Sequence, residues 1–276
     1  MDSQQMVGRR IAALRREKGY TQENVSTVLK VTPQAVSKWE QGHALPDALL
    51  LPSLARLLGV SIDRLLTGAD MLPQASPYDG AYQQPGYYWG MQPSELAEQV
   101  AGLLPDSRRR RLLDIGSGEG RDAVYFAKCG FTVDALEISP AGIAKINRYS
   151  EASGYAVNAV QADMIGYEPE RGYDVVYSCG SLQFLPLPQR QRHFDKYKQQ
   201  TKPEGLNAHL VFVDKPFIAV APDWEPNEFF YQSGDLACYY RDWEILLCDE
   251  QIVDCQSAGI GHRHAVSRII ARKPAD

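Results

Sequence analysis

The sequence predicts a small all-α domain followed by an α/β domain built on a doubly wound, largely parallel sheet. A length of 276 residues suits about two domains. Residues 1–70 show only helical periodicity, in short stretches separated by tight turns. From Arg111 onward, short apolar runs alternate with helical stretches, which is typical of strands joined by crossover helices.

Composition and charge indicate a soluble chain with an unequal charge distribution. Apolar residues make up 44%, and the longest apolar runs are far too short to cross a bilayer. No apolar leader precedes Arg9, and the five cysteines lack CxxC spacing, so we expect reduced thiols, a cytoplasmic location and no membrane contact. Residues 1–70 carry nine Lys/Arg against seven Asp/Glu, whereas the remainder carries twenty against twenty-seven. Any nucleic-acid contact is therefore expected in the first segment.

Two threonines mark predicted helix starts in residues 1–70. Thr21 can cap one helix, and Thr32 can cap the next, which covers Pro33–Glu40. Proline is tolerated at a first helical position because its missing N–H costs nothing there. The outward side of this second helix would carry Gln34, Ser37 and Lys38.

Over about sixty-five residues the segment resembles the Cro-like (XRE-type) helix-turn-helix family, through Thr21-Gln22, Val31–Gly42, Leu45-Pro46 and Leu57–Ser61. The resemblance implies a homodimer on double-stranded DNA, with Thr32–Glu40 as the recognition helix in the major groove. Gln34 would read base edges, and Gln22 and Lys38 would contact phosphates. The implied DNA-binding set is Gln22, Thr32, Gln34, Ser37 and Lys38. The alternative is a five-helix interaction module without a DNA role.

A segment rich in Pro, Gly, Gln and Tyr separates the two predicted domains. Residues 71–86 have no periodicity and are expected to form a semi-extended linker. The predicted domains are therefore residues 1–70 and 87–276.

A glycine-rich turn joins the first predicted strand of the second domain to a helix. Leu112–Ile115 runs into Gly116–Gly120, and a second strand, Phe131–Glu137, ends in an acid. Glycines let the backbone turn tightly and approach a ligand with no Cβ in the way. The acid after the second strand can accept both hydroxyls of a ribose.

Three features favour a Rossmann-like class I methyltransferase domain with S-adenosyl-L-methionine over a dehydrogenase-like or degenerate fold. Asp114 ends the first strand, Asp163 follows the third, and the runs Trp243–Asp249 and Ala265–Ala271 predict an antiparallel C-terminal hairpin in a seven-stranded sheet. The predicted cofactor-binding residues are Asp114, Gly116, Ser117, Gly118, Gly120, Glu137, Ile138, Asp163, Met164 and Cys179.

The second domain also resembles the tellurite-resistance (TehB-like) methyltransferases, through Tyr87–Gly90, Leu113–Ala123, Tyr239–Glu244 and Ile269–Lys273. The resemblance implies a small soft acceptor, such as a thiol, selenite or tellurite. The family has a His-Arg pair and a further Arg near its substrate. In a rough alignment, Cys255-Gln256 occupies the positions of the His-Arg pair, so the pair is not retained. Arg263 aligns near the single Arg.

The loop after the fourth predicted strand would face the methyl group. Cys179–Leu185 contains neither the Asn/Asp-Pro-Pro-aromatic block of amino DNA methyltransferases nor a Pro-Cys nucleophile, so DNA methylation is not expected. Tyr88 and Trp89 either close over the sulfonium through cation–π contact or pack in the core. Trp224 lies in an insertion that can form a substrate lid. The predicted substrate pocket consists of Tyr88, Trp89, Trp224, Cys255 and His264.

The candidate catalytic residues are His262, Arg263 and Cys179. His262 could orient or deprotonate an acceptor. We expect His262 and His264 to point to opposite faces of an extended segment, so both cannot easily bind one metal, and no metal site is predicted. With Cys248 and Cys255 they would form either a soft-ligand pocket for a metalloid or ordinary hairpin packing and a solvated turn. Two main functions stay open: an active small-molecule methyltransferase coupled to DNA, or a transcription regulator that senses S-adenosylmethionine or a toxic compound without significant turnover. A third, an RNA or protein methyltransferase, is disfavoured because the second domain lacks a basic catalytic surface.

Overall fold

The computed structural model describes residues 3–68, 76–169, 172–219, 221–222, 228–256 and 260–275. Contacts divide the chain into two units, residues 1–74 and 75–276. Within the described part of the chain, no helix is both long and apolar enough to span a bilayer.

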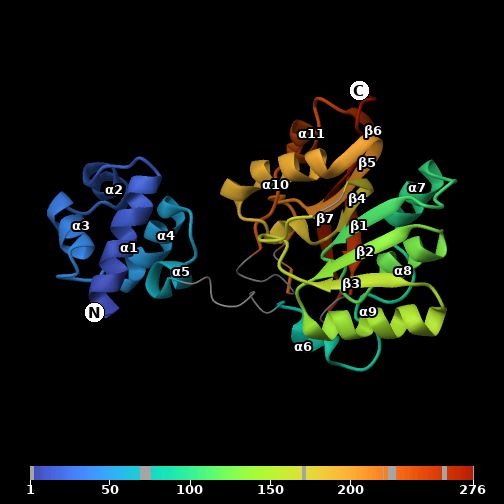
Figure 1. Ribbon diagram of the computed structural model, residues 1–276, viewed down its shortest axis with the longest axis horizontal. Coiled ribbons are helices and arrows are strands. Elements are labelled where there is room, and N and C mark those ends of the chain that lie inside the picture. Colours follow the sequence, from blue (N-terminus) through green and yellow to red (C-terminus); the bar gives the residue numbers. More distant parts are fainter. Residues whose placement is uncertain are drawn as a thin grey trace. The chain divides into compact units, whose positions relative to one another are not determined.

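The first unit is a bundle of short helices, as predicted (Figure 1). Its helices are α1 (Ser3–Glu17), α2 (Gln22–Leu29), α3 (Pro33–Glu40), the 3₁₀ turn Ala48–Leu50, α4 (Leu51–Leu58) and α5 (Ile62–Thr67). Apolar residues at helical spacing meet in one core, which includes Ile11, Val25, Val36, Leu54 and Leu58, all fully buried.

The turn between α2 and α3 is defined at both ends by local hydrogen bonds. Thr21 caps α2 by accepting from the N–H of Asn24, whose side chain bonds back to the Thr21 N–H. Lys30 ends α2 in the left-handed region at φ 55°. Thr32 then caps α3 by accepting from the Ala35 N–H at 3.2 Å, with Pro33 at the first helical position. The predicted helix-turn-helix is confirmed.

The second unit contains a seven-stranded sheet in the order β3-β2-β1-β4-β5-β7-β6. The strands are β1 (Arg111–Ile115), β2 (Thr132–Glu137), β3 (Val157–Gln161), β4 (Tyr173–Cys179), β5 (Thr201–Phe212), β6 (Glu244–Cys255) and β7 (His262–Arg272). β1 to β5 run parallel, whereas β7 pairs antiparallel with both β5 and β6. The predicted Rossmann-like fold with an antiparallel C-terminal hairpin is confirmed.

Helices cover both faces of this sheet. One face packs against α7 (Glu95–Leu103), α8 (Arg121–Lys128) and α9 (Pro140–Ser153), and the other against α10 (Leu187–Gln200) and α11 (Asp235–Tyr239). Because the strands are parallel, β1, β2, β4 and β5 end at one edge of the sheet, and the antiparallel β7 begins there. Ligands of open α/β sheets bind outside this edge.

The structure differs from the predicted linker at residues 76–86. This segment belongs to the second unit and contains α6 (Asp79–Tyr82). Tyr82 is 4% exposed, because it packs beside Gly118 and Gly142. The frequent Pro and Gly suggested an extended chain, whereas its tyrosines bury enough surface to fix it onto the sheet domain. Residues 69–75 lie outside the described residues.

Candidate active site

The glycine turn after β1 depends on positive φ angles. Gly116, Gly118 and Gly120 have φ of 70°, 58° and 89°, which L residues with side chains adopt only at a cost. A Cβ at Gly116 would collide with Ser181, and one at Gly118 would lie 3.0 Å from Tyr82 Oη. The backbone therefore approaches neighbouring groups more closely than a side chain would allow.

Glu137 ends β2 beside this turn and is 5% exposed. Its Oε2 accepts from the Gly118 N–H and its Oε1 from the Ser139 N–H, both at 2.8 Å. Burial raises the pKa of Glu137, and the backbone donors oppose that rise. Each carboxylate oxygen has a second acceptor position, so this group can still accept two hydroxyls.

The other predicted cofactor residues lie around the same turn. Asp114 is 2% exposed at the end of β1, and burial together with repulsion from Asp122 raises its pKa well above the usual value. Ser117 donates to the Leu136 carbonyl, and Ile138 follows Glu137 directly. Asp163 lies in the turn after β3 and accepts from the Ile165 N–H at 2.9 Å, while Met164 packs against the core.

Two buried charge networks near the turn were not predicted from the sequence. Glu119 accepts from Lys145 Nζ at 2.5 Å and from the Trp89 N–H at 3.3 Å. Asp122 accepts from the Ser94 N–H at 2.8 Å, the Ser94 hydroxyl at 2.8 Å and the Tyr177 hydroxyl at 2.7 Å. Both acids belong to the glycine turn and the start of α8, where only the glycines pointed to a function in the sequence. Their hydrogen-bond partners lie 26 to 55 residues away in the chain.

An aromatic cluster, defined here as Tyr78, Tyr82, Tyr88, Trp89 and Phe184, lies against the turn. Trp89 Nε1 donates to Tyr82 Oη at 3.0 Å, and the Tyr88 and Trp89 rings meet edge to face at 4.7 Å. Tyr78 contacts both Trp89, at 5.3 Å, and Phe184, at 6.3 Å, between ring centroids. The cluster therefore joins the predicted Tyr88 and Trp89 to the loop after β4.

Cys179 ends β4 next to Arg121, whose Nη2 is 3.7 Å from its sulfur. Burial and the nearby Asp122 carboxylate raise the pKa of Cys179 to about 11. A thiol with that pKa is protonated at neutral pH and is a poor nucleophile. The catalytic role of Cys179 therefore stays a prediction, and the raised pKa of its thiol argues against that role.

Gln183, which sequence reasoning did not single out, lies fully buried in the loop after β4. Its amide nitrogen donates to the Gly180 carbonyl at 2.7 Å, and within the described residues its Oε1 has no hydrogen-bond partner. A buried carbonyl oxygen without a donor is uncommon and costly. Gln183 is therefore an additional candidate for contact with a bound molecule.

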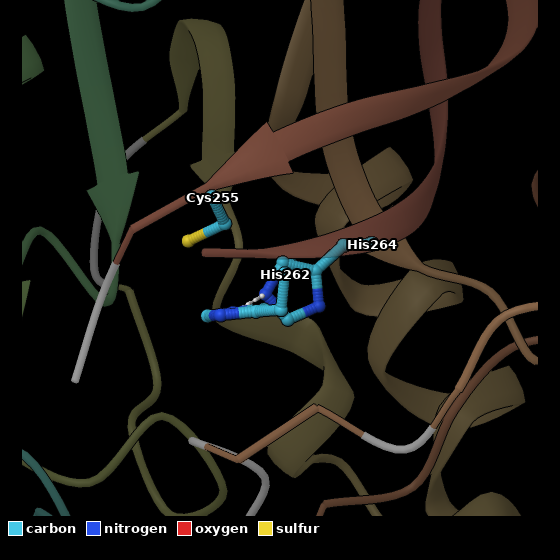
Figure 2. Close-up of side chains that lie close together, drawn as sticks. All are labelled: Cys255, His262 and His264. Atoms are coloured by element: carbon cyan, nitrogen blue, oxygen red, sulfur yellow. Dashed lines mark hydrogen bonds between the residues drawn. The ribbon is translucent and has the colours of Figure 1, made fainter. Parts of the chain in front are cut away.

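The β6–β7 hairpin end brings Cys255, His262 and His264 together (Figure 2). The prediction that the two histidines point to opposite faces was wrong, since residues two apart in a strand share a face. Arg263 lies between them and pairs with Asp254 on the other face. Cys248 pairs with Ile269 further along the hairpin, also on the other face, and is not part of the group. Trp224 lies outside the described residues.

Four of the five predicted DNA-binding positions lie on α3 or cap it, and the fifth, Gln22, begins α2. Thr32, Gln34 and Lys38 are exposed, and Ser37 is half-buried and accepts from the Gln41 side chain at 3.2 Å. Gln22 differs from expectation, because its amide donates to Glu40 at 2.8 Å. Arg15 also binds Glu40 through two nitrogens, at 2.5 and 3.1 Å. Gln22 thus helps to hold α2 against α3, and its phosphate contact stays a prediction.

Comparison with known proteins identifies both units. Residues 11–65 match the helix-turn-helix family. The chain is 42% identical over 73 residues to an uncharacterized HTH-type transcriptional regulator of Sinorhizobium fredii, covering 26% of this chain and 95% of that protein.

The second unit matches the family of tellurite resistance protein TehB over residues 82–263. A probable S-adenosyl-L-methionine-dependent methyltransferase TehB of Haemophilus influenzae is 24% identical over 51% of this chain and 49% of that protein. Hemagglutinin 1 of Eikenella corrodens is 25% identical over 58% and 51%. The chain thus spans about half the length of these curated relatives.

The crystal structure of TehB from Haemophilus influenzae superposes with a TM-score of 0.57 at 22% identity, covering 64% of this chain and 62% of that one. The chain belongs to the TehB family, with a helix-turn-helix unit before the family domain.

Proposed function

We propose that this chain transfers a methyl group from S-adenosylmethionine to a small soft nucleophile, and that its helix-turn-helix unit binds a specific DNA sequence. The observation that carries the proposal is Glu137, a buried carboxylate fixed by two backbone N–H groups beside a turn of positive-φ glycines. This arrangement fits a ribose held close to bare backbone.

The bound cofactor would supply an electrophilic sulfonium methyl group for in-line displacement. Glu137 would accept the ribose hydroxyls, and Asp163, after β3, would accept from the adenine amino group. The aromatic cluster would offer its ring faces to the positive sulfonium, a contact worth about 0.5–2 kcal/mol. The side chains around the turn therefore bind and align, which is the main contribution that such a displacement needs.

The residues at the end of β4 favour a soft acceptor that is already ionised when it binds. Cys179 is protonated at neutral pH, with a pKa of about 11, so it is not a ready base for removing an acceptor proton. A selenite or tellurite oxyanion, or a thiolate, needs no such base. The loop Cys179–Leu185 also lacks the residues that hold a flipped base, which argues against DNA as the methyl acceptor.

Calorimetric titration of the full chain with S-adenosylmethionine tests the first half of the proposal. Product detection with a thiol, selenite and tellurite panel then tests the acceptor class. We expect cofactor binding and S-adenosylhomocysteine formation with at least one acceptor. Tight cofactor binding with no product from any acceptor would instead support a transcription regulator that senses the cofactor or a toxic compound. No binding at all would refute both.

We also propose that the helix-turn-helix unit binds DNA as a homodimer. Modules of this kind commonly contact two half-sites about one helical turn, ~34 Å, apart. Selection of bound sequences from a random DNA pool, followed by footprinting, tests this. Protection of two half-sites is the expected result, and protection of one half-site by a monomer would contradict the dimer.

A further inference from the structure

Three side chains at the hairpin end of the sheet form a compact group of soft and borderline ligands. Cys255 is the last residue of β6, and His262 and His264 begin β7. The register pairs Cys255 directly with His262, which places all three side chains on one face of the hairpin. Their ligand atoms all lie within 4.8 Å of one another (Figure 2).

The hydrogen bonds fix which nitrogen of His262 can bind a cation. His262 Nδ1 is 2.7 Å from the Ile260 carbonyl, so this nitrogen carries the proton and donates. A cation binds a nitrogen that carries no proton, so Nε2 is the ligand atom of His262. It lies 2.9 Å from His264 Nε2, and His264 must hold its own proton on Nδ1 for both Nε2 atoms to bind one cation. Metal-binding histidines commonly donate their other N–H to a backbone carbonyl, which orients the ring.

The spacing is close to that of a tetrahedral site. With Zn–N of about 2.05 Å and Zn–S of about 2.3 Å, tetrahedral ligands are separated by about 3.3 Å between nitrogens and about 3.6 Å between nitrogen and sulfur. The two imidazole nitrogens at 2.9 Å are slightly closer than this, and the whole group spans at most 4.8 Å. The distances between these atoms therefore differ from the tetrahedral values by about 1 Å at most.

Among the described residues, three side chains offer ligand atoms here, and their surroundings leave room for a fourth ligand. A pocket of about 520 Å³ is lined by residues that include Cys255, His262 and Ile218. Behind the group, His264 is 3% exposed and its ring lies 4.8 Å from that of Phe212. Three protein ligands with one open position are typical of catalytic zinc sites, whereas structural sites use four.

We propose that Cys255, His262 and His264 bind a zinc-class divalent cation with one coordination position open to the pocket. One thiolate and two imidazoles favour Zn²⁺ over the oxygen-preferring Mg²⁺ and Ca²⁺. The site lies at the carboxyl end of β5, where Phe212 reaches Gly180 of the loop after β4. It is separate from the glycine turn, so its test does not depend on cofactor binding.

Cobalt titration of the reduced, metal-free full chain tests the site. Co²⁺ should produce the d–d bands of tetrahedral geometry and a thiolate-to-cobalt charge-transfer band, and Zn²⁺ should displace it. Cys255→Ser should abolish the charge-transfer band. Cys248→Ser is the matched control, because Cys248 is an exposed thiol on the same strand but the opposite face. An added small thiol should intensify the charge-transfer band if the fourth position is open.

A second variant protects the test against a folding defect. His262 is only half-buried, so His262→Gln should fold normally by circular dichroism while weakening Co²⁺ binding at least about tenfold, because even the loss of a residue that only supports a ligand costs about 10–100-fold. A spectrum without a charge-transfer band in the unaltered chain overturns the proposal. Equal loss of the band in Cys248→Ser and Cys255→Ser also overturns it.

Discussion

Replacing Glu137 with alanine removes the acceptor of two backbone N–H groups and of the proposed ribose hydroxyls. The Gly118 and Ser139 donors, both at 2.8 Å, lose their partner in a buried place, which costs about 1–3 kcal/mol of folding stability for each donor left unsatisfied. Loss of the hydrogen bonds between a charged group and the ribose costs a further 1.5–3 kcal/mol, roughly, in cofactor affinity. This corresponds to a dissociation constant about 12 to 150 times larger.

The two losses are measured separately. Isothermal titration with S-adenosylmethionine gives the affinity, and thermal unfolding without cofactor gives the stability. Glu151→Ala is the control, since Glu151 is an exposed acid on α9. Titration is performed well below the melting temperature of the variant, so that the folded fraction is complete. An unchanged dissociation constant in folded Glu137→Ala would refute the ribose assignment, even if the melting temperature falls.

Three further predictions concern other parts of the chain. Cys179→Ser should keep turnover within about threefold, because a thiol with a pKa of about 11 is not a nucleophile at neutral pH; a complete loss in the folded variant would reject this. Lys38→Ala should weaken binding to all DNA sequences and lower the salt slope by about one, whereas Gln34→Ala should relax sequence preference, as filter binding against salt can show. Burial lowers the pKa of His209 to about 3. Below about pH 6.5 the unfolded chain therefore binds more protons than the folded chain. Between neutral pH and pH 5, His209 should lower the free energy of unfolding by about 2 kcal/mol, and this contribution should be missing in His209→Asn.

The glycine turn and Glu137 could be predicted because both depend on local rules. A positive φ favours glycine, and the acid ends a strand, directly after the apolar residues Ala135 and Leu136. Tyr82 could not be predicted in the same way. Its helix has four residues, and its burial comes from Gly118 and Gly142, which follow it by 36 and 60 positions. The partners of Asp122 and Glu119 are likewise set by tertiary packing.

The β6–β7 hairpin was predicted as secondary structure, but its site was not. The register that pairs Cys255 with His262 depends on the turn between the two strands. The sequence alone does not distinguish this register from one shifted by a single residue. A shift by one residue would move Cys255 to the face opposite the histidines. The shared face of His262 and His264, by contrast, followed from strand periodicity and was misjudged.

Strand order decides how the two candidate sites are related. β1 and β2 carry the glycine turn and Glu137, and β7 carries the histidines, with β4 and β5 between β1 and β7. Neighbouring strands are about 4.8 Å apart, so β1 and β7 are separated by about 14 Å along the edge of the sheet. The end of β4 at Cys179, together with Gln183 in the following loop, lies between them. A small acceptor held there would lie between the methyl donor and the group of Cys255, His262 and His264.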